Sequence, residues 1–161
     1  MDEVHYRPIG VVHSPFKTRG EAPRQPRFGN GTRGTVEVFP EYIDGLPDLA
    51  GFSHVVLLCH MHLVDGYSLS VMPPWGDKRR SLFATRTPRR PNPIGLSVVR
   101  LEAMESGTLH VMNLDMLDGT PVLDIKPYVA PFDSDEEPTQ GWMTGKIRGL
   151  PQEDICAGGD S

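Results

Sequence analysis

The sequence has few cysteines, no long apolar run and no overall excess of basic residues, and each of these absences excludes a class of protein. Its two cysteines, Cys59 and Cys156, lie far apart in unlike contexts, so neither a disulfide framework nor a zinc knuckle is predicted. No apolar segment is long enough to span a membrane and no signal-like segment opens the chain, so we expect a cytoplasmic protein with no membrane partner. The formal net charge of -5 excludes a protein that is basic over its whole surface.

The charged residues are distributed unevenly along the 161 residues. Between Pro73 and Arg100 there are seven basic residues and a single acid, whereas acids outnumber bases from Asp133 onward. A basic patch on an acidic protein attracts a polyanion locally. A solvated loop accounts for the same pattern, so charge alone leaves both interpretations open.

Short segments rich in branched and aromatic residues dominate the chain, and Gly, Pro, Asn and Asp separate them. We expect strands within residues 9–16, 34–40, 54–63, 68–72, 81–86, 94–101, 108–114 and 121–129. Segment 40–52 indicates a helix, which Gly45 and Pro47 keep short. The pattern predicts an all-β fold over residues 1–150, either an antiparallel barrel or a sandwich. An acidic, flexible tail is predicted at residues 151–161.

A glycine motif that resembles a cofactor site is better interpreted as a turn. Residues Gly29 to Gly34 read GNGTRG and match the dinucleotide-binding pattern G-x-G-x-x-G. That pattern binds a pyrophosphate only where it opens a helix, and here a strand-like TVEVF segment follows. We therefore predict a hairpin loop at this point and no Rossmann fold.

Two histidines suggest a metal site that the neighbouring sequence does not complete. On a strand, alternate residues share a face, so His60 and His62 are expected to point the same way, with His54 on the same parity. Two histidines at this spacing can bind zinc, but no third ligand stands nearby. We favour hydrogen-bonding histidines at the end of a buried strand and predict no metal.

Two proline-stiffened basic loops and one hairpin carry the strongest indication of a binding site. The loops are PRQPR at 23–27 and FATRTPRRPNPIG at 83–95, and Gln25 offers a donor and an acceptor to a ligand. The hairpin segment, residues 117–128, turns at Asp118-Gly119, and its Asp124 and Lys126 share one strand face. We predict that the two loops form the rims of one pocket.

These segments, taken in order, carry a resemblance to a known family. IGVVHSPFKTRGEAPRQP, FSHVVLLCHMHL, FATRTPRRPNPIGLSVV and LDGTPVLDIKPY together resemble the TsaA-like family, which includes TrmO-type tRNA adenine N6-methyltransferases. The resemblance covers roughly residues 6–145. It implies a small β-barrel that binds S-adenosylmethionine without a Rossmann sheet, forms a homodimer, and methylates threonylcarbamoyladenosine beside the tRNA anticodon.

The resemblance also assigns roles to residues. It implies a cofactor pocket lined by Pro23, Arg24, Gln25, Pro26, His62, Leu63, Arg86, Leu96, Leu117, Asp118, Gly119, Thr120 and Pro121. The adenine amine is a poor nucleophile that must lose a proton, and the candidates to accept it are Asp124, Asn92 and Asp118. The expected phosphate contacts are Arg79, Arg80, Arg89 and Arg90, with Trp75 or Tyr67 as stacking surfaces for an anticodon-loop base.

Two other classes of protein remain open at this point. One is a non-catalytic barrel that binds S-adenosylmethionine or RNA, which the short acidic C-terminal segment favours. The other is a metalloenzyme that uses His60, His62 and a distant ligand. Binding without turnover would identify the first class, and metal analysis of the purified protein would identify the second.

Overall fold

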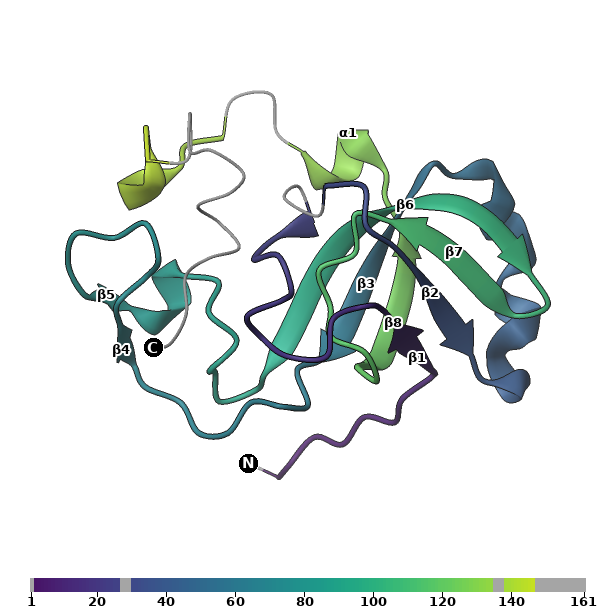
Figure 1. Cartoon of the computed structure of the whole chain (residues 1–161), viewed down its shortest axis with the longest axis horizontal. Helices are drawn as coiled ribbons and strands as arrows, with labels where there is room; N and C mark the ends of the chain where they lie inside the picture. Colours follow the sequence, from purple (N-terminus) through teal and green to yellow (C-terminus); the bar gives the residue numbers. More distant parts are fainter. Residues whose placement is uncertain (1, 27–29, 135–137, 147–161) are drawn as a thin grey trace.

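The computed structural model describes residues 2–26, 30–134 and 138–146 and forms a closed antiparallel barrel (Figure 1). The barrel strands are β1 (Gly10–His13), β2 (Arg33–Val38), β3 (His54–His60), β6 (Ile94–Glu105), β7 (Thr108–Met112) and β8 (Pro121–Pro127). They are hydrogen-bonded in the order β1-β2-β7-β6-β3-β8, and β8 closes the barrel by pairing with β1. The predicted all-β fold without a Rossmann sheet is confirmed, and the barrel alternative is the correct one.

The core fills the barrel because the strands alternate between inward apolar and outward residues. In β3, Val55, Leu57 and Cys59 are fully buried, while the residues between them are more exposed. The neighbouring strands contribute branched side chains to the same interior, among them Val12, Val36, Val99, Leu109, Val111 and Val122. Closure removes the unpaired edges that an open sheet of this size would expose.

The remaining elements are short. Two 3-10 helices, η2 (Pro40–Gly45) and η3 (Pro47–Gly51), occupy the segment predicted to be helical. The long β3–β6 connection contains the small sheet of β4 (Ser70–Val71) and β5 (Arg80–Ser81), followed by η4 (Leu82–Ala84). After β8 come α1 (Ala130–Asp133) and η5 (Gly141–Met143). None of the helices in the described ranges is long and apolar enough to cross a membrane.

Two strand predictions need correction, and one turn prediction is confirmed. The strand predicted at 54–63 ends at His60: the N–H of Met61 still donates to the carbonyl oxygen of Pro93 at 2.8 Å, but Pro93 has no N–H with which to continue the ladder. Segment 81–86 is mainly the 3-10 turn η4 rather than a strand. The hairpin loop predicted at Asn30 and Gly31 is confirmed, because both residues adopt left-handed backbone at the end of the connection between the paired strands β1 and β2; Gly29 lies outside the described residues.

The two ends of the barrel carry different connections, and the candidate site lies at the end with the long ones. The connections β1–β2 (14–32), β3–β6 (61–93) and β7–β8 (113–120) all leave from one end, here named the loop end. The opposite end carries η2, η3 and the two-residue β6–β7 turn, where Ser106 and Gly107 have φ of 50° and 84°. In Figure 1 the long connections extend to the left of the barrel and the helices η2 and η3 lie to the right. The tail predicted at residues 151–161 lies outside the described residues.

Candidate functional site at the loop end

Antiparallel topology brings the three predicted pocket segments to the loop end. Successive strands run in opposite directions, so every second connection leaves from the same end of the barrel. The register confirms this arrangement, since His13 lies opposite Thr35 and His60 lies opposite Ile94. All the predicted cofactor residues except Leu96 and Pro121 therefore lie on three connections that share one end of the barrel.

Side-chain contacts join these connections to one another. The guanidinium of Arg86 donates to Oε1 of Gln25 at 2.9 Å, which links the two proline-stiffened loops. The Arg19 side chain donates to the carbonyl oxygen of Leu63 at 2.8 Å. Since Gln25 and Arg86 are 61 positions apart in sequence, their contact is made by the fold and places the two predicted rims side by side.

The 117–120 turn is tied to the β1–β2 connection by Asp118. Its carboxylate accepts hydrogen bonds from Lys17 Nζ at 2.6 Å and from the backbone N–H of Ser14 at 3.0 Å. These two contacts, with Lys17 the larger cause, hold the pKa of Asp118 below its usual range. An anion engaged in this way anchors the loop, and this disfavours Asp118 as the proton acceptor in catalysis.

His62 leaves β3 and lies over the same turn. Its Nε2 would be 3.9 Å from a Cβ built on Gly119, whose φ of 80° belongs to the left-handed region. Burial, and then the neighbouring charge of His60, lowers the pKa of His62, so the ring is neutral at neutral pH. The prediction that His60 and His62 share a strand face is wrong, because the strand ends between them.

A metal centre finds no support in the described part of the chain. Within residues 2–26, 30–134 and 138–146, no three His, Cys, Asp or Glu side chains lie close enough together to hold an ion. Cys59 is not a ready ligand either, because burial raises the pKa of its thiol to about 12.

A second group of predicted residues lies on the outer wall of the barrel next to the loop end. Leu58 in β3 lies opposite both Leu96 in β6 and Asp124 in β8, so the three side chains form a row on one face. Leu96 is 51% exposed. His60 is two residues further along β3 and shares the face of Leu58.

The two remaining proton-acceptor candidates have different surroundings. Asp124 forms the predicted pair with Lys126, at 2.8 Å from Nζ, and its other oxygen accepts from the N–H of Ile125. Asn92 is exposed just before β6, where its backbone oxygen accepts from the N–H of Ile94 at 2.7 Å. Asp124 belongs to the row that contains Leu96, and Asn92 precedes Leu96 by four residues in sequence.

Two of the four predicted phosphate contacts are engaged within the molecule. Arg80 pairs with Asp77 at 3.1 Å, and its guanidinium lies 4.9 Å from the ring centre of Trp142. Arg90 donates to the carbonyl oxygen of Thr85 at 2.9 Å and its guanidinium lies over the ring of Phe83.

The other two are better placed to meet a polyanion. Arg79 is exposed although it donates to Ser70, and Arg89 is exposed. Of the two predicted stacking residues, Tyr67 is 58% exposed while Trp75 is partly buried.

Sequence reasoning missed one titratable group at the loop end. Asp115 accepts a hydrogen bond from Oγ of the fully buried Ser97 at 2.5 Å. Burial raises the pKa of Asp115 to about 6, although the Ser97 hydrogen bond and the charge of Arg86 act against that increase. The sequence did contain an indication of this site, because Asp115 is an acid between two apolar residues, Leu114 and Met116, which the structure shows to be buried.

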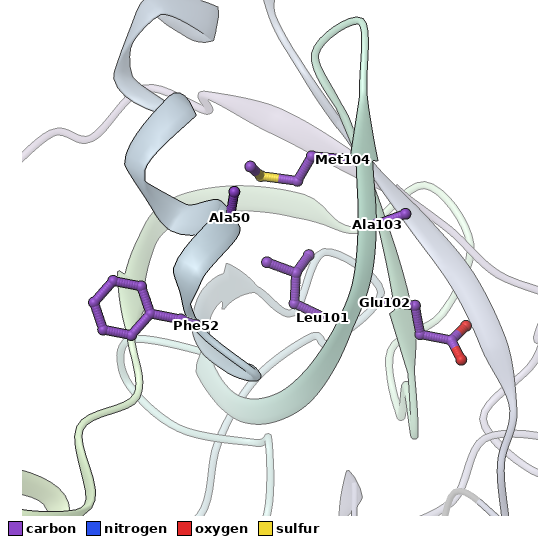
Figure 2. A pocket seen from close by; sticks show the side chains of 6 residues that line it. All are labelled: Ala50, Phe52, Leu101, Glu102, Ala103 and Met104. Atoms are coloured by element: carbon purple, nitrogen blue, oxygen red, sulfur yellow. The ribbon is translucent and has the colours of Figure 1, made fainter.

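A shallow cavity of about 180 Å³ lies at the opposite end of the barrel (Figure 2). Its lining residues are Ala50, Phe52, Leu101, Glu102, Ala103 and Met104. Figure 2 shows Leu101 and Met104 pointing toward η3, whereas Glu102 points away. The cavity is separated from Leu96 by several residues of β6, at about 3.3 Å each, and it belongs to a different part of the surface.

The fold and candidate site together define a class of protein: a small closed β-barrel whose candidate binding residues lie on long connections at one end. A comparison with protein families then identifies the family. The chain belongs to the family of the tRNA-methyltransferase O N-terminal domain, whose model matches residues 11–134.

Relatives agree with this assignment. The chain is 46% identical over 127 residues to an Archaeoglobus fulgidus protein named S-adenosyl-L-methionine-binding protein, covering 79% of this chain and 91% of that one. It is 39% identical over 157 residues to the mouse tRNA (adenine(37)-N6)-methyltransferase, covering 93% of this chain but 36% of the mouse protein.

A solved structure has the same fold. The crystal structure of TrmO from Pseudomonas aeruginosa matches with a TM-score of 0.74 and 41% sequence identity, over 87% of this chain. The matched region is 62% of the TrmO chain, so this protein spans under two thirds of that structure.

Proposed function

We propose that this protein is an S-adenosylmethionine-dependent tRNA methyltransferase that methylates the exocyclic amino group of threonylcarbamoyladenosine beside the anticodon. The family and the names of its relatives support the reaction class. The structural observation that carries the proposal is the Arg86–Gln25 contact, because it assembles two separate predicted pocket segments at the loop end.

The chemistry of the loop-end residues suits this cofactor. S-adenosylmethionine has a carboxylate, an ammonium, a sulfonium and a flat adenine. Arg86 supplies a guanidinium for a carboxylate, while the exposed Leu63 and Leu96 supply apolar surface for a ring. Backbone groups of the 23–26 and 117–121 segments can bind the polar edges at little entropic cost, because prolines and the Asp118 anchor already hold them in place.

The protein's share of the mechanism is to position two reactants and to accept one proton. When bound, S-adenosylmethionine supplies a methyl group already activated by its sulfonium. Holding the acceptor amine in line with that group can remove about 7–11 kcal/mol of the barrier. Asp124 is our first candidate to accept the amine proton, because its carboxylate lies in the row that contains Leu96 and is paired with Lys126. Asn92 is the second candidate, as a hydrogen-bond acceptor that orients the amine.

Substitution of the two candidates tests this assignment. We expect Asp124→Asn to lower kcat by about 10²–10⁴-fold while cofactor affinity stays unchanged, since the residue acts on the proton rather than on binding. Asp48→Asn is the matched control, because Asp48 is an exposed carboxylate in η3 at the opposite end. If Asp124→Asn and Asn92→Ala both keep wild-type rates, neither residue has the proposed role.

Calorimetry with S-adenosylmethionine, followed by a methyl-transfer assay on tRNA that carries threonylcarbamoyladenosine, tests the function itself. We expect binding and turnover. Binding without turnover would instead identify a non-catalytic binding module. No binding of the cofactor would remove the methyltransferase proposal altogether.

We also propose that the protein acts as a homodimer and in the cytoplasm, where its tRNA substrate is found. Exposed apolar side chains near the site support the dimer; they are Leu63, Tyr67, Leu69, Met72 and Leu96. Light scattering should give a molar mass twice that of the chain, and Leu96→Glu should lower the measured mass toward that of the monomer. A monomer at all concentrations would contradict this assembly.

A further inference from the structure

One exposed aromatic side chain in the β3–β6 connection takes no part in the function proposed above. Phe83, in η4, is 73% exposed. Its ring has no polar group to offer water, so exposure forgoes the free energy that burial would give. Single exposed apolar side chains are common on protein surfaces, so exposure alone assigns no role to Phe83. Its surroundings set it apart.

The short turn that carries Phe83 is held on both sides. The residue before it, Leu82, is buried, and its N–H donates to the carbonyl oxygen of Leu69 at 2.9 Å. The residue after it, Ala84, accepts a hydrogen bond from Nε1 of Trp142 at 2.8 Å. Segments from two distant parts of the chain therefore fix the backbone on either side of Phe83, and the ring is presented to solvent from a rigid base.

A fixed cation also lies against this ring. The guanidinium of Arg90 is 5.5 Å from the ring centre of Phe83, and it donates to the carbonyl oxygen of Thr85 at 2.9 Å. A guanidinium at this distance is attracted by the ring and orients it. Most of Phe83 nevertheless remains accessible to solvent. The pair offers a flat, preorganised apolar surface beside a positive charge.

The charges of the same connection favour an anionic partner. Arg89, next to Arg90, is exposed, and so is Arg79 just before β5. Asp77, two residues before Arg79, is already paired with Arg80 at 3.1 Å and with Lys146 at 3.5 Å. A second copy of this chain that docked symmetrically through this turn would bring like charges together. A partner with both flat rings and phosphates, such as an RNA loop, matches the ring and the cations at once.

We propose that Phe83 is a stacking surface for an unpaired base of the tRNA anticodon loop, with its ring oriented by Arg90. The inference rests on the proposed function, because it names a contact to that tRNA substrate. Arg86, which donates to Gln25 at the rim of the candidate pocket, is three residues further on. Three residues span at most about 10 Å of backbone, so a base on Phe83 lies close to that rim.

Binding of an anticodon stem-loop RNA, measured at several salt concentrations, tests the proposal. We expect Phe83→Ala to weaken binding by about 5–150-fold, as for one lost base–aromatic stack, while Phe83→Trp keeps the affinity. The slope of log affinity against log salt should stay unchanged in Phe83→Ala, because no phosphate contact is removed. Phe132→Ala is the matched control, since Phe132 in α1 is 85% exposed. Wild-type affinity in Phe83→Ala, or no binding of this RNA by the wild type, would overturn the proposal.

Fluorescence of Phe83→Trp gives a second measurement, which a merely structural role of Phe83 would not affect. A base stacked on the new indole should quench the emission that this variant adds to that of Trp75 and Trp142. Phe132→Trp is the control, and RNA should change its emission only as much as that of the wild type. Equal changes in the two variants would contradict stacking at Phe83.

The outcomes separate this inference from the proposed function. RNA binding that depends on Phe83, without methyl transfer, would refute only the methyltransferase. Methyl transfer by Phe83→Ala with a wild-type KM for tRNA would refute only the stacking role. A molar mass that falls in Phe83→Ala while RNA affinity stays unchanged would place Phe83 at a contact between copies of the chain and would overturn the proposal.

Discussion

Asp115, Asp118 and Asp124 lie within ten residues of one another, yet the barrel gives each carboxyl group different surroundings. Asp115 lies between core residues and its pKa is raised, whereas Asp118 is bound by Lys17 and its pKa is lowered. Asp124 lies on the outer wall in an ion pair with Lys126. The three residues look alike in sequence, and their different roles follow from desolvation and from which cation the fold places beside each.

Asp115→Asn should stabilise the protein near neutral pH. The folded-state pKa of about 6 lies above the ordinary value of 3.8, so between these values the folded protein holds a proton that the unfolded chain has lost. Stability therefore falls as the pH rises through this window, and the cost persists above it. Chemical denaturation should show the variant gaining about 1–3 kcal/mol of unfolding free energy relative to wild type between acid and neutral pH.

Asp48→Asn, which removes an exposed carboxylate, should show no such gain and serves as the control. If Asp115→Asn raised the unfolding free energy by the same amount at acid and at neutral pH, this would contradict a buried carboxyl group that titrates between them.

At the scale of single elements, close approach of strands sets strict limits on side-chain size. Gly34 in β2 leaves no room for a larger residue, because an added Cβ would lie 2.5 Å from Leu114 and 2.6 Å from the carbonyl oxygen of His13. One neighbour is core and the other is backbone, and neither can move freely.

Gly34→Ala should lower the unfolding free energy by about 1–3 kcal/mol through overpacking. Gly45→Ala, at the end of η2, is the matched control, since nothing lies within 4 Å of its added Cβ. Thermal or urea unfolding of both variants measures the difference. Equal stabilities would mean that β1 and β2 separate easily to admit the methyl group.

Strand ends illustrate how far local sequence can predict an element. The alternating core residues of β3 were predictable, because a strand buries every second side chain. The end of β3 at His60 was not, because it depends on the partner strand, where Pro93 has no N–H for the next hydrogen bond. Because β3 ends at His60, the predicted sharing of one strand face by His60 and His62 is also wrong.

At the scale of the whole molecule, basic and acidic residues are concentrated in different parts of the sequence. The chain has a net charge of -5, yet the β3–β6 connection is strongly basic. Its arginines differ in exposure, since Arg80 and Arg90 are partly buried in contacts within the molecule, while Arg79, which donates to Ser70, and Arg89 are exposed. A polyanion can then be attracted to one face of an otherwise acidic protein.

Binding of tRNA should therefore depend strongly on salt, and Arg89 should contribute to that dependence. We expect Arg89→Gln to reduce the slope of log affinity against log salt by about 1, as for one lost phosphate contact. Arg100→Gln is the matched control, because Arg100 is exposed in β6 further from the loop end. A slope that is unchanged in Arg89→Gln, or that falls equally in both variants, would exclude Arg89 as a phosphate contact.

By itself, the sequence determined the strand segments, the all-β class and the identity of most candidate pocket residues, because periodicity, turn residues and family motifs are local signals. The tertiary structure alone decided which of them meet. It joined Gln25 to Arg86, engaged Arg80 and Arg90 internally, and placed Asp115 against Ser97. Contacts between residues far apart in sequence depend on barrel closure and strand register, and burial then sets the charge of each group. The candidate pocket is for that reason a property of the closed barrel rather than of any one segment.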